Sequence, residues 1–189
     1  KIYGEHYTPY NVVKLLLNAL DIKETDILLD PCVGTGRMLM VVKDTLPFKN
    51  ITFIGQEKNP IAWTLAQMIA LLYDNNLKTG SSPQDALQQI LDISANHVMM
   101  NPPFNQSYSQ ALEINSQIWD ETTCRKSNLN FTWIQLALHY IKQNGDAAVI
   151  LPQTSLSMQR KEDVAARQML IENKYIEGII CLPRGIFPS

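Results

Sequence analysis

His97-Val98-Met99-Met100-Asn101-Pro102-Pro103-Phe104 is the stretch that decides the fold class of this chain. Its apolar first half is typical of a buried strand, which we predict over residues 97–101. Two consecutive prolines cannot continue a central strand, because each fixes φ and lacks an N–H group. The strand therefore ends here and delivers Asn101 and Phe104 to the edge of a sheet, where ligands bind in open α/β folds.

Residues 101–104 carry groups that suit a planar molecule with an amino group. The Asn101 amide oxygen and the Pro102 carbonyl can accept hydrogen bonds from an NH2 group, while the Phe104 ring can stack on the plane. The stretch therefore predicts a site that binds or reacts at an exocyclic amine. The alternative is an ordinary exit from a strand, with Phe104 packed in the core.

Strands and helices alternate along the rest of the chain. Apolar runs predict strands at residues 26–30, 51–56, 147–151 and 176–182, with a short edge strand within 74–84. Helices are predicted from Pro9 to about residue 20 and over residues 37–46, 60–73, 85–91, 131–143 and 162–172. Such alternation predicts an α/β fold with a doubly wound, mostly parallel sheet.

Local signals mark the ends of several helices. Thr8 followed by Pro9 predicts a hydroxyl cap and a proline in the first turn. Asn59 and Pro60 begin another helix, and Asn144-Gly145 is expected to end the helix over residues 131–143. Apolar positions recur at helical spacing in the first and third helices, at Val13, Leu16, Leu17 and Leu20 and at Ile61, Leu65, Met68, Ile69 and Leu72.

Composition indicates one compact domain, since the chain has 189 residues, of which 46% are hydrophobic and 18% charged. The chain has a net charge of −2 and no basic stripe, so we do not expect it to bind nucleic acid strongly by itself. Cys32, Cys124 and Cys181 are far apart, form neither a disulfide framework nor a zinc motif, and favour the reducing cytoplasm. No apolar run is long enough to span a bilayer.

The loop Asp30-Pro31-Cys32-Val33-Gly34-Thr35-Gly36 follows the strand over residues 26–30. Its glycines allow a tight turn beneath a ligand, and the helix after it points its N-terminus at an anionic group. Two phosphate fingerprints do not fit, because no Gly-Lys-Ser/Thr completes a P-loop and Leu39 replaces the third glycine of dinucleotide-binding loops. A carboxylate is the better ligand, and Asp30 could bind a cationic amine beside it. The loop thus predicts an amino-acid moiety, with a purely structural turn as the alternative.

Two further acids follow predicted strands. Glu57 lies 21 residues after Gly36, near the spacing at which such folds place an acid that binds both ribose hydroxyls. Asp85 stands where a third strand would end, and it could accept a hydrogen bond from an adenine amino group. The alternatives are a solvated charge for Glu57 and a helix N-cap for Asp85.

These motifs resemble the S-adenosylmethionine-dependent amino-methyltransferases. Gly4-Glu5-His6-Tyr7-Thr8-Pro9, ahead of the glycine loop, is similar to the N-terminal cofactor motif of adenine-N6 DNA methyltransferases. More narrowly, the chain resembles the modification (M) subunit of type I restriction–modification systems, whose late motifs match residues 149–152 and 181–187. The resemblance covers nearly the whole chain. It implies a Rossmann-like class I methyltransferase fold, with residues 1–189 forming a single catalytic domain.

The resemblance also implies S-adenosylmethionine as cofactor and the N6 amine of a flipped adenine in DNA as target. The catalytic set is Asn101, Pro102, Pro103 and Phe104: Asn101 and the Pro102 carbonyl would accept from the amine, and Phe104 would stack on the base. Around the cofactor it places Tyr7, Thr8 and Pro9 at the methionine end, Asp30, Pro31, Gly34 and Gly36 at the amine and carboxylate, Glu57 at the ribose and Asp85 at the adenine.

Partners and missing parts follow from the same resemblance. Type I members act on DNA with a separate specificity subunit that selects the sequence, and with a restriction subunit; no membrane and no metal are implied. The chain is expected to be a fragment of the catalytic domain, without its final strand. The polar residues 105–128 are predicted to form a mobile loop beside the target pocket, where Trp119 either wedges at the DNA or packs locally.

The chain departs from the family at two places. Cys32 and Val33 replace a small residue followed by cysteine, and no cysteine nucleophile is implied. An acid often precedes the strand in the family, whereas Asn96 and His97 stand in that region here. We expect His97 to be a capped or surface histidine rather than a base. Two other functions stay open, namely a methyltransferase for an RNA base or a protein glutamine amide, and a non-catalytic scaffold. Residues 4–9 favour the DNA enzymes over the RNA and glutamine enzymes.

Overall fold

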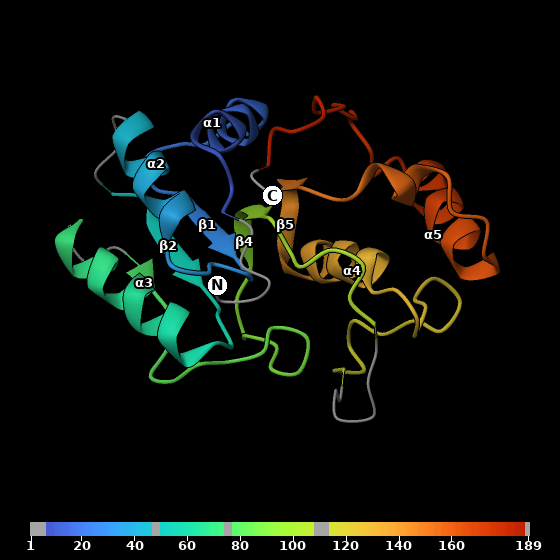
Figure 1. Ribbon diagram of the computed structural model, residues 1–189, viewed down its shortest axis with the longest axis horizontal. Coiled ribbons are helices and arrows are strands. Elements are labelled where there is room, and N and C mark those ends of the chain that lie inside the picture. The colour runs from blue at the N-terminus through green and yellow to red at the C-terminus, as the bar shows by residue number, and fades with distance from the viewer. Residues whose placement is uncertain (1–6, 47–49, 74–76, 108–113, 188–189) are drawn as a thin grey trace.

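The computed structural model describes residues 7–46, 50–73, 77–107 and 114–187. Its centre is a five-stranded sheet in the order β3-β2-β1-β4-β5, in which all neighbouring strands are parallel. The strands are β1 (Ile27–Asp30), β2 (Thr52–Gly55), β3 (Leu77–Lys78), β4 (Ala95–Met100) and β5 (Ile141–Val149). The predicted doubly wound α/β fold is confirmed, and so is the edge strand within residues 74–84 (Figure 1).

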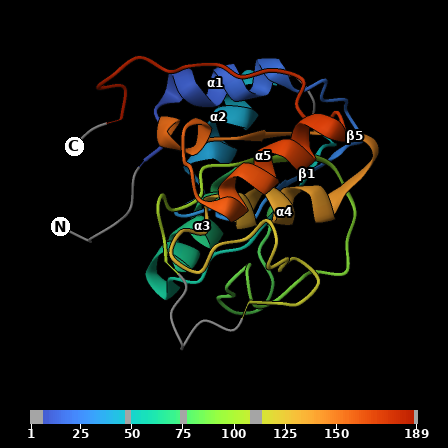
Figure 2. The same ribbon diagram turned by 90° about the vertical axis from the view of Figure 1, so that its right-hand side faces the viewer.

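Helices cover both faces of this sheet. They are α1 (Tyr10–Ala19), α2 (Arg37–Thr45), α3 (Pro60–Leu72), α4 (Asn130–Tyr140) and α5 (Lys161–Glu172), with a short 3-10 helix, η1 (Gln153–Leu156), before α5. Leu28 faces the core that includes α1, α2 and α3, whereas its neighbour Leu29 faces the core that includes α4. The strands are apolar on both sides for this reason. Helix α5 packs outside α4 through Phe131, Ala166 and Leu170 (Figure 2).

Residues 85–91, predicted as a helix, form turns instead. The Asp85 carboxylate accepts a hydrogen bond from the Leu87 N–H group at 3.0 Å. The Leu91 N–H group donates to the buried Tyr140 hydroxyl at 2.9 Å. A continued helix would have paired the Leu91 N–H group with the Leu87 carbonyl. The Leu91 N–H group instead bonds a side chain, and the Leu87 carbonyl accepts from the Asn115 N–H group, so contacts with distant residues explain the wrong prediction.

The helix predicted over residues 131–143 ends at Tyr140, and the chain enters β5 at once. Asn144-Gly145 lies inside β5, where the pairing with β4 shifts register, so the prediction that it ends a helix is wrong. Asn144 has a φ of 65°, and a Cβ atom on Gly145 would lie 2.5 Å from the Asn96 carbonyl oxygen. Glycine is required at position 145 because the two strands are in close contact there. An Asn-Gly pair in such a contact cannot be distinguished, from the sequence alone, from an Asn-Gly pair that ends a helix in a turn.

Residues 176–182 were expected to form a last strand, and they form none. The segment is apolar, yet Ile179 and Ile180 are 59% and 61% exposed. No strand pairs with it in the parts of the chain that the structure describes. A strand needs a neighbour to pair its backbone groups, so apolar composition alone does not form one.

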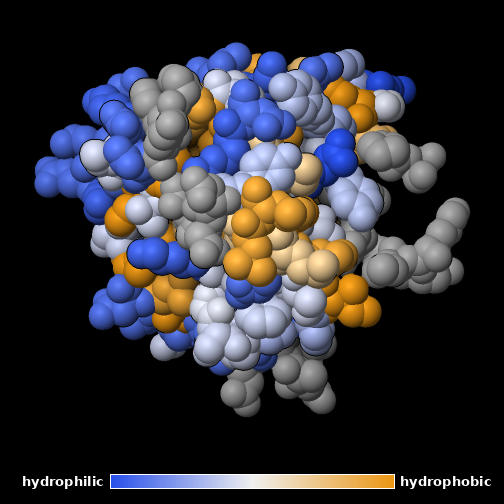
Figure 3. Space-filling view, turned by 90° about the vertical axis from the view of Figure 1, so that its left-hand side faces the viewer, coloured by the Kyte–Doolittle hydropathy of each residue, from blue (hydrophilic) through white to orange (hydrophobic). Residues whose placement is uncertain are grey.

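Helix α3 turns its small residues inward. Its buried side chains are Ala62, Ala66 and Ala70. The loop before α2 approaches closely, because a Cβ atom on Gly36 would lie 3.3 Å from the Ala66 Cα atom. Of the larger apolar side chains on α3, Ile69 packs against the core, whereas Leu72 is 81% exposed. Hydrophobic side chains accordingly show on this side of the molecule in Figure 3.

His97 is buried within the sheet rather than on the surface. Its Nε2 atom lies 2.8 Å from an Asp26 oxygen, and its Nδ1 atom contacts the Asp146 carboxylate. Burial would raise the pKa of Asp26, but hydrogen bonds from His97 and from the Lys23 backbone outweigh it and lower the pKa below 3.8. The histidine thus joins β4 to β5 and to the residue before β1, at the end of the sheet opposite Asn101.

Replacing His97 with alanine is expected to lower the free energy of unfolding by about 3 kcal/mol at pH 7, because Asp26 and Asp146 lose a shared partner. Since the pKa of Asp26 is lowered by folding, its stabilisation is present above about pH 4 and is lost as the pH falls through the folded-state pKa. Urea unfolding should therefore show a smaller loss in acid than at neutral pH. Asn50→Ala, which breaks an exposed hydrogen bond to Glu24 at 3.0 Å, is the control and should change stability little. Equal losses in the two variants would contradict this account.

Candidate active site

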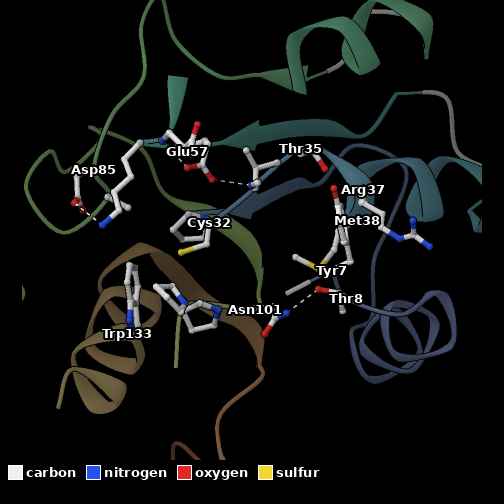
Figure 4. Close-up of a pocket in the computed structure, with 18 of the residues that line it drawn as sticks. Tyr7, Thr8, Cys32, Thr35, Arg37, Met38, Glu57, Asp85, Asn101 and Trp133 are labelled. Carbon is white, nitrogen blue, oxygen red and sulfur yellow. Dashed lines mark hydrogen bonds and ion pairs between the residues drawn. The ribbon is translucent and has the colours of Figure 1, made fainter. Parts of the chain in front are cut away.

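A cavity of about 270 Å³ opens at the carboxyl ends of β1, β2 and β4 (Figure 4). Parallel strands end together at this edge, so distant parts of the sequence meet there. The predicted residues that line it are Tyr7, Thr8, Pro31, Gly34, Glu57, Asp85, Asn101, Pro102, Pro103 and Phe104. Pro9, Asp30 and Gly36 are each next in sequence to a residue that lines the cavity, but they do not line it themselves. Residues 4–6 of the N-terminal motif lie outside the described ranges.

The Glu57 carboxylate is hydrogen-bonded to the backbone of the glycine loop. One of its carboxylate oxygens accepts from the Gly34 N–H group at 3.0 Å, and the other accepts from the Asn59 N–H group at 2.7 Å. Gly34 and Gly36 have φ angles of 56° and 84°, so the loop can turn beneath the cavity and begin α2. Glu57 is therefore not a freely solvated charge. Each carboxylate oxygen can accept a second hydrogen bond, which leaves capacity for hydroxyl groups in the cavity.

Asp30 is buried beneath this loop, at the end of β1. Its Oδ1 atom accepts from the Cys32 N–H group at 2.9 Å, while its Oδ2 atom is buried without a hydrogen-bond partner among the described residues. Burial raises the pKa of Asp30 to about 8, a shift that the Cys32 N–H group opposes and the Glu57 carboxylate reinforces. At pH 7 the side chain is thus mainly protonated. A bound cation would satisfy the open oxygen and favour the ionised form.

Asp85 and Trp133 flank one end of the cavity, and Tyr7 and Thr8 flank the other (Figure 4). The Asp85 carboxylate accepts from the Lys58 Nζ atom at 3.3 Å, and it caps no helix. Trp133, on α4, is 3% exposed, and its Nε1 atom has no hydrogen-bond partner in the described chain. Sequence analysis missed Trp133, because an aromatic residue on an apolar helix face is typical of an ordinary core position.

Asn101 leads the tetrapeptide out of β4 toward the cavity. Its Nδ2 atom donates to the Thr8 hydroxyl at 2.9 Å, and the two side chains lie side by side in Figure 4. The prediction that the Thr8 hydroxyl caps α1 is therefore wrong, because the N-cap of α1 is Pro9 and no side chain caps the helix. The Thr8 hydroxyl orients the Asn101 amide instead. Thr8 therefore belongs to the site through its contact with Asn101, whereas the resemblance placed it against the methionine end of the cofactor.

Phe104 stands at the rim, half-buried. Its ring meets the Phe187 ring edge to face, with centroids 6.3 Å apart. Pro102 is buried and Pro103 exposed, so the backbone crosses from the core to the surface within two stiff residues. The segment over residues 181–187 thus returns to the tetrapeptide, a contact that sequence analysis did not assign.

Arg37 is a second residue that sequence analysis did not single out. It is the first residue of α2, it lines the cavity, and its guanidinium carbon lies 5.8 Å from the centroid of the Tyr7 ring. A helix N-terminus and a cation both attract anions. This end of the cavity therefore suits a carboxylate, as the glycine loop predicted.

Residues 105–107 and 114–128 of the predicted mobile loop are described. Trp119 packs against the core that contains Ile118, which supports a packing role over a wedge. The Asn115 N–H group donates to the Leu87 carbonyl at 2.7 Å, and Arg125 pairs with Asp163 of α5 at 3.2 Å. The mobility of this loop stays a prediction.

Cys32, Cys124 and Cys181 are free thiols, as expected. Across the described ranges, no three His, Cys, Asp or Glu side chains cluster in a way that could hold a metal ion. The helices in those ranges are all too short or too polar to cross a membrane.

The sequence profile of the N-6 DNA Methylase family matches residues 1–189. The chain belongs to this family. One relative, the Type I restriction enzyme HindI methylase subunit of Haemophilus influenzae, is 26% identical over 195 residues, which are 98% of this chain and 44% of that protein. The chain therefore spans less than half the length of this relative.

Solved structures show the same fold. A type I restriction-modification system methyltransferase subunit from Streptococcus thermophilus superimposes with a TM-score of 0.76 at 24% identity, covering 91% of this chain and 40% of that one. An S-adenosylmethionine-dependent O-methyltransferase from Thermotoga maritima gives a TM-score of 0.60 at 15% identity, covering 89% and 52%. The predicted Rossmann-like class I methyltransferase fold is confirmed.

Proposed function

We propose that this chain is the catalytic part of an adenine-specific DNA methyltransferase, the modification subunit of a restriction–modification system. It would transfer a methyl group from S-adenosylmethionine to the N6 amine of adenine. The observation that carries the proposal is the position of residues 101–104, at the rim of a cavity whose walls include a glycine loop and two acids that follow strands. Membership of the N-6 DNA methylase family supports the substrate class.

The residues that line the cavity, together with Pro9, Asp30 and Gly36 directly behind its wall, fit S-adenosylmethionine. The buried Asp30 Oδ2 atom suits the amine, and the N-terminus of α2 with Arg37 suits the carboxylate. Glu57 retains acceptor capacity for the ribose hydroxyls. The other residues would bind the rest of the cofactor. Tyr7, Thr8 and Pro9 would contact its methionine end, and Pro31, Gly34 and Gly36 would form the loop beneath it. Asp85 and Trp133 would contact its adenine.

When bound, S-adenosylmethionine supplies a methyl group on a good leaving group, so the protein's task is alignment. The Asn101 oxygen and the Pro102 carbonyl would accept from the target amine and direct its lone pair toward the methyl group. Phe104 would stack on the adenine, which has to leave the duplex because its N6 amine is paired there. Thr8 holds the Asn101 amide in orientation for this role.

DNA and a specificity subunit are the partners that this function requires. A net charge of −2 supports a division of labour in which another subunit holds most of the DNA backbone. Three free thiols support a cytoplasmic location. An RNA base or a glutamine amide would fit the same four residues, whereas a scaffold without activity would not need the Asn101–Thr8 contact.

A transfer assay discriminates these functions. The full-length protein, with its specificity subunit, is incubated with radiolabelled S-adenosylmethionine and unmodified genomic DNA, total RNA or protein extract. Label recovered as N6-methyladenine from DNA is the expected result. Label in RNA or protein alone would show that the target class is wrong, and cofactor binding without transfer to any of the three would support the scaffold.

Trp133 provides a prediction for the cofactor end of the site. Trp133→Ala should weaken the affinity for S-adenosylmethionine about tenfold, because base–aromatic contacts are worth roughly 1–3 kcal/mol. Trp133→Phe keeps an aromatic ring and should lose less. Isothermal titration of both variants measures the difference, and Tyr140→Phe, which alters the same helix away from the cavity, controls for packing. Wild-type affinity in Trp133→Ala would remove this residue from the site.

A further inference from the structure

A buried cluster of asparagines lies directly after the tetrapeptide. Asn128 and Asn130, at the start of α4, are 7% and 0% exposed. Buried amides are costly unless their polar atoms are paired, and such a pair on one helix start is unusual for core residues. Their partner is Asn105, the residue that follows Phe104.

Asn130 forms two hydrogen bonds with Asn105. The Asn105 N–H group donates to the Asn130 Oδ1 atom at 2.9 Å, and the Asn130 Nδ2 atom donates to the Asn105 Oδ1 atom at 3.3 Å. Asn128 adds a third bond, from its Nδ2 atom to the same Asn105 oxygen at 3.0 Å. Backbone and side chain of one residue are thus held together by the same cluster.

Asn105 needs this support because its φ angle is 54°. Left-handed backbone is disfavoured for residues with a Cβ atom, although asparagine tolerates it better than most. This angle sets the direction in which the chain leaves Phe104. The direction of the chain in turn helps to fix where the Phe104 ring lies at the rim of the cavity.

The cluster is anchored on its far side. The Asn130 Nδ2 atom also donates to the Ser155 hydroxyl of η1 at 3.0 Å, and Arg167 of α5 donates to the Ser155 carbonyl at 3.2 Å. The Leu129 N–H group donates to the Gln106 carbonyl at 2.8 Å, one residue beyond Asn105. A helix start and two further elements therefore brace the exit of the tetrapeptide.

We propose that Asn130 is a positioning residue for methyl transfer, which acts through Asn105 to hold Phe104 and the backbone of the tetrapeptide in the orientation that the target base requires. This inference rests on the proposed function, because it assumes that residues 101–104 meet the target. It goes beyond that function by assigning a catalytic consequence to a residue outside the cavity. Without it, the network would serve stability alone.

The test compares Asn130→Leu with Asn130→Asp in the full-length protein and its specificity subunit, with unmodified genomic DNA as substrate. Leucine has a similar shape but cannot accept from the Asn105 N–H group, whereas aspartate can. We expect kcat to fall by between about 10- and 100-fold in Asn130→Leu, because small displacements at a reacting centre cost this much. Asn130→Asp should keep at least several times the kcat of Asn130→Leu. The dissociation constant of S-adenosylmethionine should be unchanged in both.

Thr123→Val is the matched stability control, because it removes the hydroxyl that accepts from Gln135 on the same helix at 3.1 Å, outside the cavity. It should lower the melting temperature without lowering kcat. Asn130→Leu with wild-type kcat, or with a kcat loss shared by Thr123→Val, would overturn the proposal. Absence of transfer by the wild-type protein would instead overturn the proposed function, so the two failures are distinguishable.

Asn105 provides a second pair of variants if Asn130→Leu does not fold. The residue is exposed, so substitutions there spare the core. Glycine adopts positive φ without strain, whereas valine strongly resists it. We expect kcat of Asn105→Val to be at least about fivefold below that of Asn105→Gly, at equal cofactor affinity. Equal kcat values in the two variants would show that the left-handed backbone conformation at position 105 does not affect methyl transfer, and would overturn the proposal.

Discussion

Replacing Asn101 with alanine is expected to slow methyl transfer by about 10²–10³-fold, the range seen when one preorganised polar contact to a transition state is removed. The Asn101 oxygen is proposed to accept from the target amine as that amine becomes positive, an interaction that grows during the reaction. Binding of S-adenosylmethionine does not depend on it. The dissociation constant should therefore stay within about twofold of the wild-type value, while the single-turnover rate on DNA falls.

Alanine at position 101 also breaks the 2.9 Å hydrogen bond to Thr8, and a control has to separate the two effects. Thr8→Val removes the same bond but leaves the Asn101 oxygen in place. Loss of one ordinary hydrogen bond is worth about 1 kcal/mol, so we expect Thr8→Val to slow transfer by no more than about tenfold. If Asn101→Ala transferred methyl groups as fast as Thr8→Val, Asn101 would not be the acceptor.

The sequence predicts which residues meet at the ends of the strands. Asp30 ends β1, and Glu57 and Asn101 come after β2 and β4. A parallel sheet brings such positions to one edge whatever their separation in sequence. The apolar runs that predict buried strands are therefore also the signal that collects the site. For this reason the sequence alone places residues 30–36, 57 and 101–104 together.

Residues that depend on packing between elements were not predictable in this way. Trp133 borders the cavity because α4 lies beside the end of β4, and nothing local distinguishes it from a core tryptophan. Alanines rather than larger residues face inward on α3 because Gly36 approaches Ala66. Thr8 bonds Asn101, 93 residues away, although its place before Pro9 is typical of a helix cap. Side-chain contacts between distant elements decided each case.

Replacing Asp30 with asparagine is expected to abolish measurable binding of S-adenosylmethionine while leaving the fold intact. Asparagine keeps an oxygen for the Cys32 N–H group, which bonds Asp30 Oδ1 at 2.9 Å, but it cannot become an anion. The proposed partner of Asp30 Oδ2 is the cationic amine of the cofactor, and an amide would meet it with a neutral atom or with its own NH2 group. Isothermal titration at pH 8 measures the loss, and an unchanged affinity would remove Asp30 from the site.

Dependence on pH tests the same assignment in the wild-type protein. Burial raises the pKa of Asp30 to about 8, so cofactor binding below that pH has to release a proton, and affinity should fall by up to about tenfold per pH unit from pH 8 to pH 6. Above about pH 8 the α-amino group of the cofactor loses its own proton, and affinity should fall again. In the protein without cofactor, the raised pKa of Asp30 affects the stability of the fold, and stability falls as the pH rises. The folded state holds a proton that the unfolded state has lost between about pH 4 and pH 8, so stability declines with rising pH over this range.

Asp30→Asn carries no such proton, so its melting temperature should exceed that of the free wild-type protein by a margin that grows from pH 5 to pH 8. A substitution that removes cofactor binding and yet stabilises the fold is hard to explain unless Asp30 is buried for its ligand. Wild-type affinity that is flat from pH 6 to pH 8, together with a constant melting difference, would show that Asp30 is ionised in the free protein and that its open oxygen is not the amine site.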